Sequence, residues 1–132
     1  MNRVLARVVL LTGMFVGPCF AANIPALNWT QRSDWYNVKT NSPAALGDGV
    51  ADDTAALQAA LNKFTNTVNA VNTVYLPPGN YRITSMLTWP KSTGKRLIGH
   101  GRDTRIFWDG PVGGVMLRSD GAARCDFIGI VW

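Results

Sequence analysis

The chain has 132 residues, the size of one modest domain, and carries a formal net charge of +5. With 47% hydrophobic and 16% charged residues it is not a disordered chain, and it has enough apolar material for a packed core. All 8 acidic residues are Asp, and together with 13 Gly this composition favours turns and strands over long surface helices. The Lys and Arg residues are scattered, so no nucleic-acid-binding stripe is predicted.

Residues 1–21 are expected to form a cleaved secretory signal peptide. Residues 1–7 are basic, residues 8–16 are apolar but too few to cross a bilayer, and cleavage is expected after Ala21. The alternatives are an uncleaved membrane anchor and a lipoprotein signal ending at Cys19, which the preceding proline fits poorly. The mature protein is therefore predicted to be secreted or periplasmic, with no membrane contact after cleavage.

Residues 22–46 are predicted to be an irregular leading segment with one short strand at 35–38. Two tryptophans in it, Trp29 and Trp35, are expected to pack over the end of the core rather than to bind sugar. Residues 47–49, Gly-Asp-Gly, then signal a turn.

A helix is predicted over about residues 52–65. Asp52 is a good N-cap because its carboxylate can accept hydrogen bonds from the free amides of the first turn. Asp53, just inside, favours the positive end of the helix dipole. One apolar stripe at helical spacing follows, formed by Ala56, Leu57, Ala60, Leu61 and Phe64.

Seven short β-rich runs separated by turn signals follow the helix. They lie at residues 73–76, 81–84, 86–89, 95–98, 104–108, 115–118 and 125–132. Such spacing suggests a sandwich, a barrel or a solenoid. Every third run recurs, from Val74 to Leu97 and then to Phe127, as the three-stranded turns of a parallel β-helix require.

Five segments together resemble the start of the pectate-lyase-like superfamily, and within it the rhamnogalacturonase/epimerase-like pectate lyase domain. They are WYNV (35–38), GDGVADDT (47–54), ALQAAL (56–61), TVYLPPGNYRI (73–83) and LIGHG (97–101). The resemblance spans about residues 34–132. It implies a mainly β fold, a right-handed parallel β-helix over residues 47–132, with coils from about residue 73 and the predicted helix capping the N-terminal end.

The resemblance also implies an exported protein that acts on an acidic plant-type or microbial polysaccharide. A pectin or rhamnogalacturonan lyase or a glycoside hydrolase is expected, and a non-catalytic carbohydrate-binding, adhesin-like or tailspike-like protein is the alternative. A small complete β domain with another binding role is the third hypothesis. In related enzymes the working groove lies along the middle coils, so no catalytic, cofactor-binding or metal-binding residue is assigned in this chain. Ca²⁺ would be needed by the parent protein if it is a lyase.

The chain is expected to be an N-terminal fragment of such a protein. A solenoid needs roughly three or more stacked repeats with caps. Here one full coil, a second, and the first strand of a third can be counted, and the last run, at 125–132, is apolar. Residues 22–132 alone are expected to fold poorly, which sharp, cooperative melting of a monomer would contradict.

For the aspartates near the predicted helix start we favour structural roles over catalytic ones. Asp52 and Asp53 are expected to cap the helix, because a glycosidase pair needs carboxyl groups about 5 to 9 Å apart on either side of one bond. Asp48 is expected to bond its own backbone at the turn rather than to hold a cation.

The remaining candidates are a histidine, a cysteine and two arginines. His100 is expected to be a solvent-facing turn residue without a partner, rather than a general base. Cys125 is expected to be a small buried apolar side chain, and its pairing with His100 is a weak lead. Arg102 and Arg105 could meet a uronate carboxylate but are expected to be solvated at turns.

Overall fold

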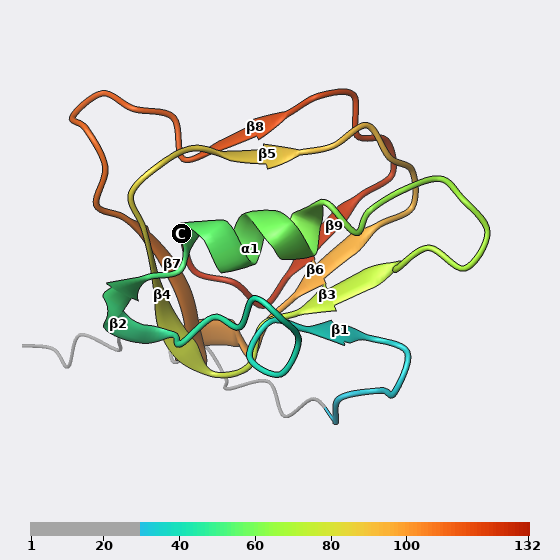
Figure 1. The fold of residues 1–132 in the computed structure, drawn as a ribbon, viewed down its shortest axis with the longest axis horizontal. Coiled ribbons are helices and arrows are strands. Elements are labelled where there is room, and N and C mark those ends of the chain that lie inside the picture. The colour runs from blue at the N-terminus through green and yellow to red at the C-terminus, as the bar shows by residue number, and fades with distance from the viewer. Residues whose placement is uncertain (1–29) are drawn as a thin grey trace, which may run out of the picture.

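The computed structural model describes residues 30–132. The predicted signal peptide and Trp29 lie outside the described residues. The described part is mainly β, with short strands and one α-helix (Figure 1). Its strands are β1 Tyr36–Asn37, β2 Asp48–Asp52, β3 Thr73–Tyr75, β4 Gly79–Ile83, β5 Leu87–Trp89, β6 Arg96–Ile98, β7 Thr104–Trp108, β8 Leu117–Ser119 and β9 Asp126–Ile128.

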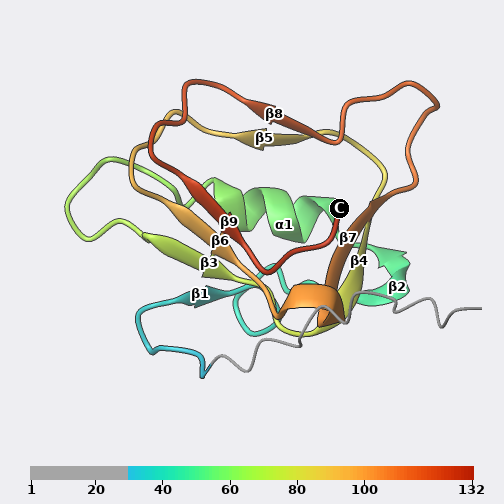
Figure 2. The same cartoon turned by 180° about the vertical axis from the view of Figure 1, so that it is seen from behind.

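The strands form three parallel sheets, in the orders β1-β3-β6-β9, β2-β4-β7 and β5-β8. Along the chain β3, β4 and β5 each enter a different sheet, and β6, β7 and β8 then lie beside them in the same sequence (Figures 1 and 2). The predicted recurrence is confirmed, because Val74 pairs with Leu97 and Leu97 pairs with Phe127. The fold is therefore β-helix-like, and the antiparallel alternatives left open by strand spacing are excluded.

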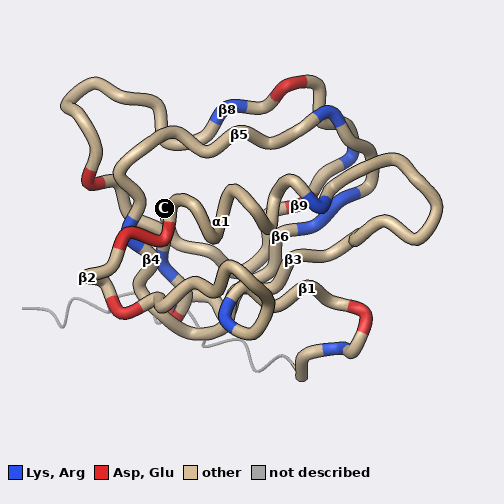
Figure 3. Tube along the Cα trace, viewed as in Figure 1, with Lys and Arg blue, Asp and Glu red and all other residues tan. Residues whose placement is uncertain are grey.

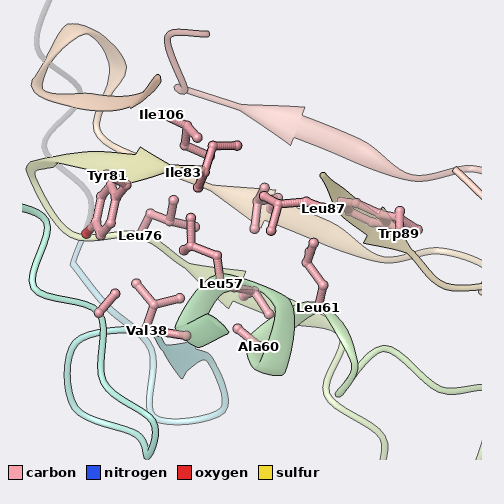
Figure 4. Packing of buried hydrophobic residues seen from close by; sticks show 14 of the residues in the cluster. Val38, Leu57, Ala60, Leu61, Leu76, Tyr81, Ile83, Leu87, Trp89 and Ile106 are labelled. Carbon is pink, nitrogen blue, oxygen red and sulfur yellow. The ribbon is translucent and has the colours of Figure 1, made fainter. Parts of the chain in front are cut away.

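The core fills the space between the three sheets and helix α1, Thr54–Leu61 (Figure 4). The predicted apolar stripe is confirmed for the four residues inside the helix, all of them buried, and Phe64 is buried as well although it lies beyond the helix end. The sheet residues that share this cluster include Val74, Leu76, Tyr81, Ile83, Leu87, Trp89 and Ile106. Because full burial of one such side chain stabilises by roughly 1.5–3 kcal/mol, the stripe ties the helix firmly to the coils.

The helix is shorter than the predicted 52–65, and its start differs from the prediction. The N-cap residue is Asp53, not Asp52, and the Asp53 carboxylate makes no capping hydrogen bond. The Asp52 carboxylate instead accepts the amide of Thr54, the first helical residue, at 3.0 Å. After Leu61, the amide of Asn62 still bonds four residues back, to Gln58, but the amides of Lys63 and Phe64 bond only three residues back, which tightens the chain where the helix ends.

Strand β2 is not foreseen by the turn prediction for residues 47–49. A turn is present, since Asp48 Oδ1 accepts the amides of Val50 and Ala51 at 2.8 and 2.9 Å. The same residues nevertheless pair with β4, with a register shift between Asp48 and Asp52. The positive φ of Gly49, 81°, lets the chain turn inside a strand, which a side chain at that position would oppose.

The final β-rich run is also shorter than predicted, because β9 covers Asp126–Ile128 rather than residues 125–132. A separate bridge links Val131 to Arg105 beside β7. Within residues 30–132, no helix has the length and apolar character needed to cross a membrane.

Candidate functional site

The outer face of the β2-β4-β7 sheet carries polar and charged side chains beside one aromatic ring. Successive residues of a strand point to opposite faces, so the buried Tyr81, Ile83 and Ile106 face the core. The side chains on the opposite face are Asn80 and Arg82 on β4 and Arg105 and Phe107 on β7, which together form the β4–β7 face. Asn80 lies opposite Arg105, and Arg82 lies opposite Phe107.

An open hollow of about 270 Å³ lies on this face, lined by Gly49, Asn80, Arg105 and Phe107. The guanidinium carbon of Arg105 lies 5.8 Å from the centre of the Phe107 ring, within cation–π range. Gly49 has no side chain to fill the hollow from the β2 side. The hollow can therefore hold a small group against a positive charge, an amide and a ring.

A second set of contacts lies where β2 meets the start of the helix. The Asp52 carboxylate accepts hydrogen bonds from the hydroxyl of Thr54 and from that of Thr84, the latter at 2.6 Å. These two hydroxyls, in that order, lower the pKa of Asp52 to about 2. Asp52 is therefore an anion at neutral pH and has no proton to give to a leaving group.

Arg82 lies between this acid and the next coil. Its Nε donates to Asp109 at 2.6 Å, and its Nη1 donates to the carbonyl oxygen of Val50 at 3.1 Å. Figure 3 shows both signs of charge close together where β2, β4 and β7 lie side by side. Arg82 on β4 thus links β2 to Asp109, the residue just after β7, and both of these contacts are to the scaffold.

The prediction for Asp48, which bonds its own backbone, is confirmed, whereas the prediction that the Asp53 carboxylate caps the helix is wrong. Asp48 turns the backbone, and its hydrogen bonds with the Val50 and Ala51 amides lower its pKa. Asp53 is buried and accepts the amides of Leu46 and Gly47 with its two oxygens, at 2.7 and 3.0 Å. Burial raises the pKa of Asp53 despite those bonds. Since Asp52 and Asp53 serve different partners, they do not form a glycosidase pair.

His100 has a partner that the sequence did not indicate. Its Nε2 lies 2.5 Å from the hydroxyl of Tyr75, at the adjacent corner of the preceding coil. The Tyr75 ring also packs against Trp35, with ring centres 5.7 Å apart. The half-buried Trp35 thus packs on the coil, as predicted, while the prediction of an unpartnered His100 is wrong.

The Cys125–His100 lead is wrong as well. Cys125 comes just before β9 and His100 just after β6, and these two strands are parallel and in register. The two side chains therefore lie at opposite ends of the strand pair, roughly 15 Å apart at about 3.3 Å per residue. The thiol is partly buried rather than fully buried and faces the carbonyl oxygens of Ser92 and Ala123.

The two candidate arginines have different settings. Arg102 is exposed in a short 3₁₀ turn, Gly101–Asp103, with its Nε 3.8 Å from Asp103, as expected for a turn residue. Arg105 is exposed but lies on strand β7, so the expectation that it sits at a turn is wrong. Its strand position is what places it over the hollow.

The family of the chain follows from the segment that builds this scaffold. The model of the family described as Rhamnogalacturonase A/epimerase, pectate lyase-like matches residues 35–107, which run from the start of β1 into β7. This chain belongs to that family. The β4–β7 face of this family member lies within the matched residues.

Among curated relatives, the chain is similar to mannuronan C5-epimerases of Azotobacter vinelandii. It is 54% identical to AlgE5 over 48 residues, which is 36% of this chain and 4% of that protein. It is 50% identical to AlgE6 over 50 residues, which is 38% of this chain and 5% of that protein. The chain therefore spans only a small part of the relatives it matches.

A solved structure, Geobacillus virus E2 - ORF18, is also similar. It matches with a TM-score of 0.50 and 27% identity, over 73% of this chain and 23% of that one. This likeness supports the β-helix-like arrangement of the family member.

The expectation of Ca²⁺ in a lyase parent finds no ligand set here. Within residues 30–132, no group of three or more His, Cys, Asp or Glu side chains is placed to hold a metal ion. The acidic side chains of the β2 region are engaged by amides, hydroxyls and Arg82. These residues do not fit a calcium site, and no reaction step is derived through one.

The grouping of Asn80, Arg105 and Phe107 was missed in the sequence. Arg105 and Phe107 are two residues apart, which places them on one face of a strand. That signal was present, but the partner Asn80 is 25 residues earlier and becomes a neighbour only through the pairing of β4 with β7.

Proposed function

We propose that this chain is the N-terminal part of an exported, polysaccharide-active protein built on a right-handed parallel β-helix. Helix α1 would cap the stack, because its buried stripe covers inward-facing side chains of the first coil. The signal-like pattern of residues 1–21 supports secretion or delivery to the periplasm.

The proposed partner is an acidic polysaccharide. The observation that carries this proposal is the 54% identity over 48 residues to enzymes named for mannuronan, a uronate polymer. The exposed cation on the β4–β7 face supports it, since a guanidinium is well suited to bind a carboxylate. The scattered basic residues give no support to a nucleic-acid partner.

The proposed chemistry is that of a polysaccharide lyase, a glycoside hydrolase or, as the names of the relatives suggest, a C5-epimerase acting on uronate units. Each reaction needs acid–base groups positioned at one sugar residue. The acids of the β2 region are committed to structural partners, so we assign no catalytic residue among residues 30–132. The catalytic groups would lie on other coils of the parent protein.

Binding of the full chain to polymannuronate tests the choice of partner, with dextran as the neutral control. Affinity electrophoresis should show retardation by the acidic polymer alone. The retardation should weaken strongly as salt is raised to about 1 M, where charges are screened over about 3 Å. Equal retardation by dextran, or none by polymannuronate, would contradict the proposal.

A second experiment tests the placement of the chemistry. The full chain is incubated with polymannuronate and assayed for unsaturated ends by ultraviolet absorbance, for new reducing ends, and for altered C5 configuration by proton NMR. We expect no product in any of the three assays, because no catalytic group is assigned here. Product in any one of them would show that the chain carries its own active site.

A non-catalytic binding protein, adhesin-like or tailspike-like, is the second candidate function. The similarity to a virus protein, with 27% identity over 73% of this chain, supports this second candidate function. The same three assays on a longer parent protein separate the two candidates. An enzyme would yield one of the products, whereas a binding protein would retain the polymer unchanged.

A further inference from the structure

We propose that Arg105, Phe107 and Asn80 form a subsite that holds one uronate unit of an acidic polysaccharide. The inference rests on the proposed function and names the contact through which the polymer would be held. The site is the hollow of about 270 Å³ on the β4–β7 face, which is close in size to the smaller ligand pockets of proteins.

The first argument is the availability of the Arg105 charge. Of the six other described arginines, all but Arg124 lie within 4.0 Å of a carboxylate oxygen; these five are Arg32, Arg82, Arg96, Arg102 and Arg118. Arg105 has no such ion pair among residues 30–132, and its guanidinium rests over the Phe107 ring instead. An exposed guanidinium held near a ring is oriented without being neutralised, so it can take a carboxylate in a two-point contact.

The second argument concerns the acids nearby, which would otherwise repel an anionic ligand. Asp109 is paired with Arg82 at 2.6 Å. Asp48 directs one oxygen to two backbone amides, and Asp52 is held by two hydroxyls. Each of these carboxylates therefore has hydrogen-bond donors of the protein as partners. Arg105 is the charged residue among those that line the hollow.

The third argument is the composition of the hollow. Asn80 lies directly opposite Arg105 across the strand pair and brings an amide that can donate to or accept from a sugar hydroxyl. Phe107 offers an apolar surface for the C–H face of a pyranose ring. Charge, amide and ring together match the carboxylate, hydroxyl and C–H groups of one uronate unit.

The test is calorimetric titration of the full chain with a mannuronate hexamer at low salt, and with a neutral mannose hexamer. Arg105→Gln should weaken mannuronate binding at least tenfold, as expected for the loss of a charge-assisted hydrogen-bonding pair. Arg105→Lys should weaken it less, because the charge stays while the two-point contact is lost. Phe107→Leu should weaken binding roughly threefold, since it removes the ring under the guanidinium.

Arg118→Gln is the matched control, because Arg118 is an exposed arginine on β8 in another sheet. It should leave the affinity unchanged, and circular dichroism should be the same for all variants. If Arg105→Gln binds mannuronate as well as the unchanged chain does, the subsite is wrong while the proposed function stands. If the unchanged chain binds neither hexamer, the proposed function and the subsite both fail.

Discussion

Strands β3 and β9 belong to the same sheet and have similarly apolar centres, yet they differ in burial. All three residues of β3, Thr73–Tyr75, are buried, whereas none of β9, Asp126–Ile128, is fully buried. Between them β6 buries two of its three residues. In a stack of parallel strands, burial depends on position, because each coil is covered by the coils beside it and, in the first coil, by helix α1.

Truncating one tryptophan in each region tests whether position in the stack decides how much a buried ring stabilises the fold. Trp89 is 1% exposed and packs on Phe64 and Phe127, with ring centres 4.7 and 4.9 Å apart. Trp89→Ala should lower the free energy of unfolding by about 3–5 kcal/mol, because it leaves a cavity that the coil cannot fill. Urea denaturation followed by circular dichroism measures this loss.

Trp132→Ala is the matched variant, since Trp132 is 45% exposed and contacts Phe127 at 5.6 Å between ring centres. It should cost about 1 kcal/mol, the scale of one aromatic pair. Equal losses for the two variants would show that position in the stack does not decide burial energy.

A second pair of variants compares two carboxylates of the first coil, Asp53 and Asp48. Asp53→Asn replaces a buried carboxylate whose two oxygens accept the Leu46 and Gly47 amides. An asparagine supplies one acceptor and turns an N–H toward the other amide, so unfolding should become easier by roughly 1–3 kcal/mol. Urea denaturation at pH 7 checks this.

Asp48→Asn is the control for that change, because a single oxygen of Asp48 accepts both of its amides. Asparagine can provide the same oxygen and is favoured in such turns, so stability should hardly change. A loss as large as that of Asp53→Asn would point to charge rather than to the count of acceptors.

The smallest effect is expected at the exposed edge of the same coil. Thr84→Val removes one of the two hydroxyls that lower the pKa of Asp52 to about 2, so that pKa should rise toward its ordinary value. The cost at pH 7 should be about 1 kcal/mol. Titration of the Asp52 carboxyl carbon by NMR measures the pKa directly.

The sign of the pH dependence follows from the direction of that shift. A carboxyl whose pKa is lowered in the folded state stabilises the fold above its unfolded value, 3.8, and this stability is lost as the pH falls toward 2. Thr84→Val should make the loss between pH 4 and 2 shallower. Thr65→Val, at an exposed hydroxyl paired with Thr67, should leave both the pKa and the pH profile unchanged.

Periodicity predicted much of this fold. The recurrence of Val74, Leu97 and Phe127 became the register of β3, β6 and β9, and strand β7 has the predicted bounds, 104–108. The helical stripe predicted the buried face of α1 because the 3.6-residue repeat places those side chains on one side. These features depend on residues close together in the chain or spaced regularly along it.

The polar side chains were harder to place. Asp53 looked like a helix residue near the dipole but turns back to the leading segment, and the Asp52 carboxylate reaches Thr84, 32 residues later. The partner of His100 is Tyr75, 25 residues earlier. A polar group is satisfied by whichever donor or acceptor the fold brings near, and local spacing carries no record of that choice.

The sequence by itself determined the family, the parallel coil period and the apolar face of the helix, because each depends on a local or repeating pattern. Only the tertiary structure decided which carboxylates accept hydrogen bonds from backbone amides and which arginine on the β4–β7 face has no carboxylate partner. The pairing of β4 with β7 brings Asn80 beside Arg105, and the Arg82–Asp109 pair neutralises the neighbouring acid. The physical reason is that charges and hydrogen-bonding groups act over a few ångströms in space, whatever their separation along the chain.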